Sequence, residues 1–219
     1  DVEINSPEFG QSFPCVCTIE ANKRGASKRY KDYCELPGLL QNKTFANWKS
    51  KPGLEDAVKA TQTFAEGQGS YRWLVLQGPA GVGKTHLGVA ILNERVAHPE
   101  YGLPGKYANW PETLNELRQG YGDNSYNERL ERYRQAPLLL IDDLGAESQK
   151  RGEGMSWPME QLYLLLNHRS LEQLETIVTT NLAVGALESR IADRLLDEGT
   201  GLCKVWNMTL PSYRSGKVW

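Results

Sequence analysis

Apolar and polar positions follow one another along most of the chain in blocks that predict helices and strands in turn. The first clear helix spans residues 54–67, where four side chains share one face at helical spacing: Leu54, Val58, Thr61 and Phe64. Short apolar runs then predict strands near 73–77, 106–109, 137–142, 175–180 and 203–207. Segments between them predict helices near 84–97, 111–118, 124–135, 157–170 and 187–197. This alternation is typical of an α/β domain with a parallel sheet between layers of helices.

Residues 1–45 show little of this periodicity and contain Gly, Pro and Cys, so we expect an irregular appendage or linker there. Residues 46–219 would then form the domain. The first ten residues, DVEINSPEFG, are polar and acidic and do not resemble a secretory signal peptide. The chain begins without Met, which leaves open whether further residues precede it.

Composition narrows the class of protein. The chain has 219 residues, of which 40% are hydrophobic, and this is enough for one sizeable core. Its 25 basic and 27 acidic residues give a net charge of −2, so no overall charge draws it to DNA or to a membrane surface. No apolar run approaches the roughly 18 residues that a membrane-spanning helix needs. The four Cys do not suggest a disulfide framework, and a reducing cytoplasm is the expected compartment.

The segment GPAGVGKT follows an expected strand, opens an expected helix and fits G-x-x-x-x-G-K-[ST] at every fixed position. Glycines let such a loop turn tightly, so that its N–H groups converge on phosphate oxygens near a helix N-terminus. Lys84 is expected to reach the β- and γ-phosphates, and the Thr85 hydroxyl to bind Mg²⁺. A glycine-rich turn that binds nothing is the weaker interpretation, because the motif and both flanks are complete. The candidate nucleotide-binding residues are Gly78, Pro79, Ala80, Gly81, Val82, Gly83, Lys84, Thr85 and His86.

The run LLLIDDL at 138–144 is apolar except for two adjacent carboxylates near its end. Burying paired charges is costly unless a cation or hydrogen bonds compensate, which favours a metal site over a simple turn. Asp142 is the expected partner of Mg²⁺, and Asp143 is a candidate for polarising the attacking water. Glu147 lies close in sequence and competes for that second role.

The interval from Thr85 to Asp142 has room for two helices and a further strand, KYAN. This spacing suggests the class of P-loop proteins that inserts a central strand between the phosphate-loop strand and the acidic strand. We interpret ETIVTTN as that inserted strand. It ends in Thr180 and Asn181, which are expected beside the γ-phosphate, where Asn181 can hydrogen-bond the phosphate or the water. An ordinary residue of a strand-end turn is the alternative for Asn181.

The segment LESRIADRLLD places Arg190 and Arg194 four residues apart on one helix face. Both can be solvated and paired with neighbouring acidic residues, which is the usual state of such side chains. The other interpretation is an arginine finger that reaches the nucleotide of a neighbouring subunit. Arg214, in LPSYRSG, is a third candidate for contact with the phosphates.

These motifs together resemble the AAA+ ATPases of the DnaC/IstB group, which includes bacterial helicase loaders and transposition helper ATPases. The likeness covers roughly residues 36–215 and is carried by TFANWK, LQGPAGVGKTHLGVAILN, LLLIDDLGAE, SWPMEQLYLLLNHR, IVTTNL, SRIADRL and PSYR. It implies a P-loop fold of the AAA+ type with ATP and Mg²⁺ as ligands. It also implies that Lys84 and Thr85 belong to Walker A, and that Asp142 and Asp143 form Walker B.

The resemblance implies further catalytic residues. Asn181 corresponds to sensor 1, and Arg214 resembles sensor 2. Arg194 matches the arginine-finger position better than Arg190 does. Asp143 departs from the wider AAA+ pattern, in which Glu is commoner, and the shorter side chain bears on the rate of hydrolysis.

Three cysteines near the N-terminus, Cys15, Cys17 and Cys34, resemble the zinc-binding N-termini of some loaders. A zinc site usually needs four ligands, and no His lies close to these three. Ordinary thiols are therefore the favoured interpretation, with zinc left as the alternative.

The segment LRQGYGDNSYNERLERYRQ interleaves arginines and tyrosines, a combination that suits single-stranded DNA because charge follows phosphates and rings stack on bases. The residues concerned are Arg118, Tyr121, Tyr126, Arg129, Arg132, Tyr133 and Arg134. The alternative is a solvated helical face on which Glu128 and Glu131 pair with the arginines.

The resemblance and the motifs predict an ATPase that loads or remodels the replicative DNA helicase. Its ATP would lie at an interface between self-associating subunits, so hydrolysis by the isolated protein would be weak. A transposition helper that acts with a transposase on duplex DNA is the second hypothesis. A nucleotide-gated adaptor without useful hydrolysis is the third, and Asp143 in place of Glu keeps it open.

Overall fold

The structure is a computed structural model that describes residues 16–49, 52–145, 155–196 and 202–210. Its strands form one parallel sheet: β1 (Trp73–Gln77), β2 (Gly105–Asn109), β3 (Leu138–Leu144), β4 (Glu175–Thr180) and β5 (Cys203–Asn207). The order across the sheet is β2-β3-β4-β1-β5. The strand β4 therefore lies between the phosphate-loop strand β1 and the acidic strand β3, which confirms the predicted insertion.

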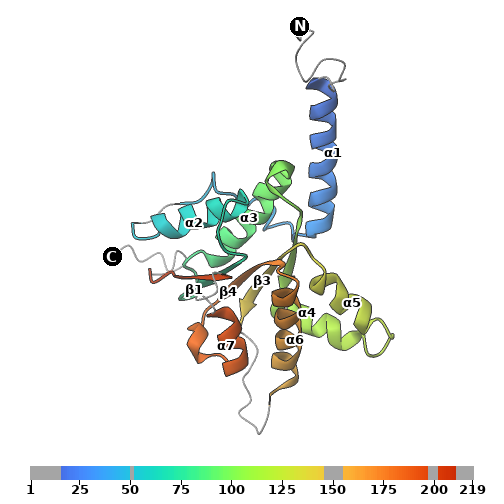
Figure 1. Cartoon of the computed structure of the whole chain (residues 1–219), viewed down its shortest axis with the longest axis vertical. Coiled ribbons are helices and arrows are strands. Elements are labelled where there is room, and N and C mark those ends of the chain that lie inside the picture. The colour runs from blue at the N-terminus through green and yellow to red at the C-terminus, as the bar shows by residue number, and fades with distance from the viewer. Residues whose placement is uncertain (1–15, 50–51, 146–154, 197–201, 211–219) are drawn as a thin grey trace, which may run out of the picture.

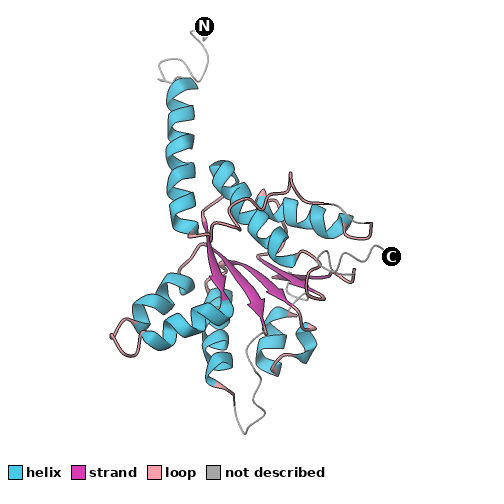
Figure 2. Cartoon of the chain, turned by 180° about the vertical axis from the view of Figure 1, so that it is seen from behind, coloured by secondary structure: helices cyan, strands magenta, loops and turns pink. Residues whose placement is uncertain are grey.

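Helices cover both faces of this sheet (Figures 1 and 2). One face carries α2 (Glu55–Ala65) and α3 (Lys84–Ala97), and the other carries α4 (Trp110–Gln119), α5 (Tyr126–Arg134), α6 (Trp157–Leu171) and α7 (Ser189–Leu195). Two short 3₁₀ helices, η1 (Pro99–Tyr101) and η2 (Val184–Ala186), lie in connections. The predicted class, a five-stranded parallel sheet between layers of helices, is confirmed for the residues that the structure describes.

Each strand contributes to two separate hydrophobic cores because successive side chains of a strand point to opposite faces. On β1, Trp73 and Val75 pack in the core under α4, α6 and α7, whereas Leu74 and Leu76 pack in the core under α2 and α3. All four side chains are fully buried. Burial on both faces explains why β1 and β3 are near-continuous apolar runs rather than alternating ones.

The helix α1 (Val16–Cys34) corrects the expectation of irregular structure at the N-terminus. Its C-terminal end packs against β2 and α3, where Cys34 is buried and Glu35 pairs with Lys106 of β2 at 2.9 Å. Figure 1 shows the rest of the helix extending away from the sheet. The division of the chain at residue 45 stays a prediction.

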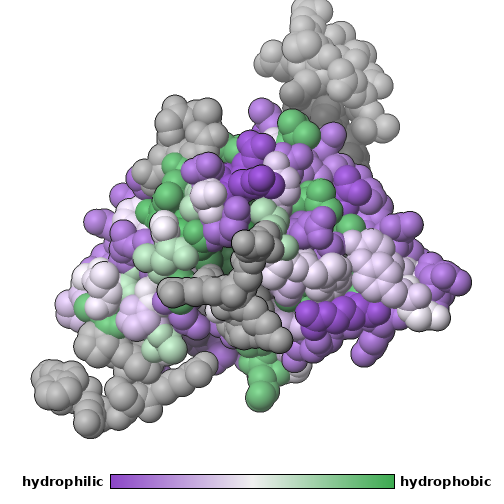
Figure 3. Space-filling view, turned by 90° about the horizontal axis from the view of Figure 1, so that it is seen from below, coloured by the Kyte–Doolittle hydropathy of each residue, from purple (hydrophilic) through white to green (hydrophobic). Residues whose placement is uncertain are grey.

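The visible surface is mostly polar. Seen from below, most of the molecule's visible face is hydrophilic, and hydrophobic residues form small separate patches (Figure 3). Among the described residues, no helix combines the length and the apolar character needed to cross a bilayer.

Candidate nucleotide-binding site

The loop between β1 and α3 needs glycine at its two ends. Gly78 and Gly83 have φ of 150° and 104°, in the region that side chains disfavour. A Cβ at Gly78 would lie 2.1 Å from the carbonyl oxygen of Met208, and one at Gly83 would lie 2.5 Å from the Trp48 ring. Since α3 begins at Lys84, the N–H groups of its first turn are available to a ligand at this loop.

Lys84 connects the loop to the end of β4. Its Nζ donates to the carbonyl oxygens of Gly78 and Pro79 and to Oδ1 of Asn181, each at 2.8 Å. The side chain is buried, so its charge acts in surroundings that screen it weakly. The ammonium group therefore lies where an anionic ligand cradled by the loop can reach it.

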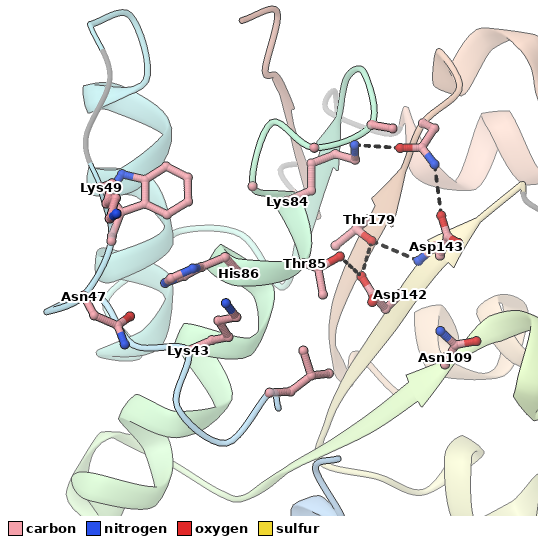
Figure 4. A pocket seen from close by; sticks show the side chains of 16 residues that line it. Lys43, Asn47, Lys49, Lys84, Thr85, His86, Asn109, Asp142, Asp143 and Thr179 are labelled. Carbon is pink, nitrogen blue, oxygen red and sulfur yellow. Dashed lines mark hydrogen bonds between the residues drawn. The ribbon is translucent and has the colours of Figure 1, made fainter. Parts of the chain in front are cut away.

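The carboxylate of Asp142 is buried and held by three hydroxyl groups. Oδ1 accepts from Oγ1 of Thr85 at 2.9 Å and from Oγ1 of Thr179 at 2.5 Å. Oδ2 accepts from the hydroxyl of Tyr107 at 3.0 Å. Figure 4 shows Thr85 and Thr179 converging on this carboxylate. A carboxylate beside a threonine hydroxyl is a set of hard oxygen donors, which fits Mg²⁺.

Asp143 lies at a β-bulge. The pairing of β3 with β4 shifts register between Ile141 and Leu144, and Asp143 has φ of 61°. Asp tolerates this left-handed conformation better than most residues do. Its N–H donates to Oγ1 of Thr179 at 3.0 Å, and its Oδ1 accepts from Nδ2 of Asn181 at 3.0 Å. The bulge thus brings Asp143 to the same pocket as Asp142.

These groups line a cavity of about 610 Å³, a usual size for a small-molecule site. Its other wall comes from the segment before α2, where Lys43, Asn47 and Lys49 lie opposite Asp142 (Figure 4). This segment, TFANWK, carries part of the family likeness, but none of its residues was predicted to belong to the site. A polar, Trp-containing stretch outside any predicted element gave no signal of its own.

His86 joins this wall to the loop. A ring nitrogen lies 2.9 Å from the carbonyl oxygen of Thr44, and the ring meets that of Trp48 edge to face, with centroids 5.2 Å apart. Burial lowers the pKa of His86 from its ordinary value, and the Thr44 carbonyl opposes this effect. A neutral His86 therefore holds residues 44–48 against the start of α3.

The predicted loop residues occupy three kinds of position. Gly78 and Pro79 supply carbonyl oxygens to Lys84, and Val82 is buried in the core beside α3. The residues of the set that line the cavity are Ala80, Gly81, Gly83, Lys84, Thr85 and His86.

At the end of β4, the expectation that Thr180 faces the site is wrong. Its hydroxyl donates to the carbonyl oxygen of Leu144 at 2.8 Å and is fully buried, whereas Thr179 and Asn181 line the cavity. The two-residue period of a strand, counted back from Asn181, would have selected Thr179. Tyr107 was also missed, because it lies inside a strand whose pattern gave no sign of site chemistry.

Arg190 and Arg194 lie apart from the cavity. Arg190 is exposed on α7, and Arg194 donates from its guanidinium to Oδ1 of Asn167 on α6 at 2.8 Å. Neither lines the cavity. Arg214 and Glu147 lie outside the described residues.

The structure separates two of the three candidate zinc ligands. Cys17 and Cys34 are both on α1, and their positions lie about 25 Å apart along the helix axis at about 1.5 Å per residue. They cannot share one ion through this helix. Cys34 is buried, and burial raises the pKa of its thiol to about 11. Cys15 lies outside the described residues, and the described part holds no cluster of three metal-binding side chains.

Most of the proposed DNA-binding arginines have acidic partners. Arg129 pairs with Asp123 at 2.6 Å. Arg132 pairs with Glu116, and Arg134 pairs with Glu131. Of the predicted acidic partners, only Glu131 is therefore found in such a pair. Tyr133 of α5 is buried, and its hydroxyl donates to the Glu116 carboxylate. It is therefore not exposed for stacking on a base.

The other members of that segment lie together with Trp157, at the start of α6. We call this group the aromatic platform: Arg118, Tyr121, Tyr126 and Trp157. The rings of Tyr121 and Tyr126 stack, with centroids 4.5 Å apart and planes 13° apart. The Arg118 guanidinium lies 4.8 Å from the centroid of the Trp157 ring, whose N–H donates to the Tyr121 hydroxyl. Tyr121 is 56% exposed.

Known proteins share this sequence and architecture. The model of a family described as IstB-like ATP binding protein matches residues 22–217. The replicative helicase loader DnaI of Bacillus subtilis is 34% identical over 134 residues, covering 61% of this chain and 39% of that protein. An ATP-binding protein in an insertion sequence of Mycobacterium tuberculosis is 29% identical over 157 residues, covering 67% of this chain and 59% of that protein. The chain thus spans less than two thirds of the length of these relatives.

A solved structure of DnaI has a TM-score of 0.62 and 26% sequence identity, and the match covers 82% of this chain and 95% of that one. The fold is therefore that of the P-loop ATPases of the AAA+ type, and the resemblance to the DnaC/IstB group is confirmed. The family match spans most of the sequence and includes the loop, the acidic strand and Asn181. The chain belongs to the family of IstB-like ATP-binding proteins.

Proposed function

We propose that this protein binds ATP with Mg²⁺, hydrolyses it, and uses that cycle to load or remodel the replicative DNA helicase. The main support for ATP binding and hydrolysis is a single cavity that brings together five side chains: Lys84, Thr85, Asp142, Asp143 and Asn181. The helicase as partner is supported by the similarity to the loader DnaI.

Binding begins with the loop. Lys84 exchanges two carbonyl partners for phosphate oxygens, and the first N–H groups of α3 add donors to the same anion. Thr85 donates its hydroxyl hydrogen to Asp142 and keeps its lone pairs for a metal ion. Asp142 and Thr85 would therefore hold Mg²⁺, which when bound neutralises charge on the phosphates.

Hydrolysis requires a base near the γ-phosphate. Asp143 is the candidate, because the bulge turns its carboxylate towards Asn181. Asn181 accepts from Lys84 and donates to Asp143, so one amide links the phosphate-binding cation to the base. This arrangement would orient the carboxylate towards the water that attacks the phosphate.

We further propose that ATP lies at an interface between subunits and that Arg194 of one subunit reaches the nucleotide of the next. Support comes from the position of Arg194 on α7, outside its own cavity, with Asn167 holding its guanidinium. A single subunit then lacks this positive charge in the transition state. Hydrolysis by the isolated protein is expected to be weak for that reason.

Single-stranded DNA is the proposed nucleic-acid partner, and the aromatic platform is its proposed contact. An exposed tyrosine stacked on a second ring, next to an arginine on a tryptophan, offers both a base-stacking surface and a charge for the backbone. The paired arginines of α5 and the buried Tyr133 are not part of this proposed DNA contact.

A second candidate function is assistance to a transposase on duplex DNA. It is favoured by the similarity to the insertion-sequence protein, which covers more of that protein than the match to DnaI covers of the loader. The nucleotide site would be the same in both cases, so the two functions differ in partner and in the form of DNA bound.

The deciding experiment is a pull-down against purified replicative helicase, single-stranded DNA and duplex DNA, each with and without ATP. ATP-dependent capture of the helicase is expected. Capture of duplex DNA without the helicase would favour the transposition-helper function over the loader function. Capture of neither, together with no binding of a fluorescent ATP analogue, would overturn the proposed function.

A further inference from the structure

We infer that Tyr107 is a positioning residue for the Mg²⁺ site and acts by fixing the orientation of the Asp142 carboxylate. The inference rests on the proposed function, because it assumes that Asp142 helps to hold Mg²⁺. Tyr107 belongs to β2, on the outer side of β3, and none of the sequence motifs includes it.

The two oxygen atoms of the Asp142 carboxylate accept hydrogen bonds from different donors. Oδ1 of Asp142 accepts both threonine hydroxyls, from Thr85 and Thr179, whereas Oδ2 accepts the hydroxyl of Tyr107 at 3.0 Å. With donors on Oδ1 alone, the carboxylate could turn about its terminal bond, a torsion with a broad energy profile. A donor on Oδ2 fixes the plane of the group, and with it the direction of the lone pairs that face the metal.

The register of the sheet explains how Tyr107 reaches that oxygen. In the parallel pair, Asn109 of β2 lies opposite Asp142 of β3, and Tyr107 lies opposite Leu140. The long Tyr107 side chain spans this offset of two residues along the sheet. Tyr107 does not itself line the cavity, so it acts on the ligand through Asp142.

Tyr107 therefore orients a side chain that is proposed to bind the metal, without lining the cavity itself. Partners that orient a metal-binding side chain typically change metal affinity by about 10- to 100-fold when removed.

The test is Tyr107→Phe, which removes one oxygen atom. A fluorescent ATP analogue is titrated into the full chain in EDTA, and then Mg²⁺ is titrated at fixed nucleotide. Mn²⁺ bound in the presence of ATP is counted directly by electron paramagnetic resonance. The half-saturating concentration of each metal is expected to rise about tenfold, while the metal-free affinity for the nucleotide stays within about twofold.

Tyr133→Phe is the matched control. Tyr133 also donates its hydroxyl to a carboxylate, that of Glu116 at 2.7 Å, but Glu116, unlike Asp142, does not line the cavity. Its metal half-saturation should equal that of the wild type. Tyr107→Leu, which lacks the hydroxyl as well, is the second variant if Tyr107→Phe does not unfold cooperatively, and the same rise is expected.

Two results would overturn the inference while leaving the proposed function intact: an unchanged metal half-saturation in the Tyr107 variants, or an equal loss of metal-free and metal-dependent nucleotide binding in those variants. The second result would mean that the hydroxyl only supports the fold. A wild-type protein that binds no nucleotide under any metal concentration would overturn both this inference and the proposed function.

Discussion

The side-chain amide of Asn181 donates a hydrogen bond to Oδ1 of Asp143 at 3.0 Å. These residues come from the ends of β4 and β3, which are neighbours in the sheet only because β4 is inserted beside β3. The contact holds the carboxylate at the cavity wall. A substitution of Asp143 that keeps this contact should therefore test hydrolysis with little effect on nucleotide binding.

Asp143→Asn is expected to lower ATP turnover by at least about 100-fold, because the amide cannot accept a proton from water. Asn keeps the size of the side chain and tolerates the left-handed backbone at this position. Affinity for ATP should stay within a few-fold of the wild type. Turnover is measured by phosphate release and binding by a fluorescent analogue. If neither turnover nor helicase loading changes, hydrolysis is incidental and the nucleotide-gated adaptor is the better description.

Gly83→Ala should weaken nucleotide binding about tenfold or more. The new methyl group would collide with the Trp48 ring, and φ of 104° costs a non-glycine residue about 1–2 kcal/mol. Gly38→Ala is the control, since a Cβ there meets nothing within 4 Å. Equal affinities for the two variants would show that the loop and the Trp48 wall do not form the nucleotide site.

Arg194→Ala should leave ATP affinity nearly unchanged and remove the turnover that appears on assembly, because its charge would serve the neighbouring subunit. Arg190→Ala, on the same helix and exposed, should retain that turnover. Both are measured as ATPase rate against protein concentration. If the ATPase rate of Arg194→Ala depends on protein concentration as that of the wild type does, Arg194 does not act on the nucleotide of a neighbouring subunit.

Tyr121→Ala should reduce affinity for single-stranded DNA about tenfold, since loss of one base–ring stack costs about 1–3 kcal/mol. The side chain is exposed, so the fold should not suffer. Leu171→Ala removes another exposed side chain, at the far end of α6, and should not change binding. Fluorescence anisotropy with a labelled oligonucleotide measures both, and equal affinities would exclude the aromatic platform as the contact.

The stability of the fold should decrease as pH rises from about 9 to about 11, partly through Cys34. Its pKa is raised from 9.0 to about 11 in the folded protein, so the unfolded chain loses the thiol proton first. Between these values the folded state binds more protons, and the free energy of unfolding falls with increasing pH. Cys34→Ala should show a shallower fall over this window in denaturant titrations. Identical slopes would mean that the thiol is not buried as described.

The sequence predicted the sheet well because β1 and β3 are apolar on both faces and the strands are bounded by recognisable loops. It missed α1 because this helix has no apolar stripe. The side chains on its less exposed side include Ala26, Ser27, Tyr30 and Tyr33, which give little hydrophobic periodicity. The helix is fixed instead by its end, where Cys34 enters the core, and that contact depends on a strand about 70 residues later.

The site was predictable where one motif contains all its parts and less so where distant residues meet. Lys84 and Thr85 follow from a local pattern. Tyr107 and Thr179 become visible only when β2 and β4 are placed beside β3. The aromatic platform likewise needs Trp157 from another helix, which no count along the tyrosine-rich segment can supply.

The β-bulge limits which amino acids can occupy the end of strand β3. In a regular strand two consecutive side chains face opposite layers, so only one acid of the pair could enter the cavity. One left-handed residue removes that alternation and gives both carboxylates a common direction. The backbone, rather than the reach of a side chain, therefore brings the second acid to the nucleotide. Asp at position 143, where a longer acid would be expected, is among the residues that best tolerate this φ angle.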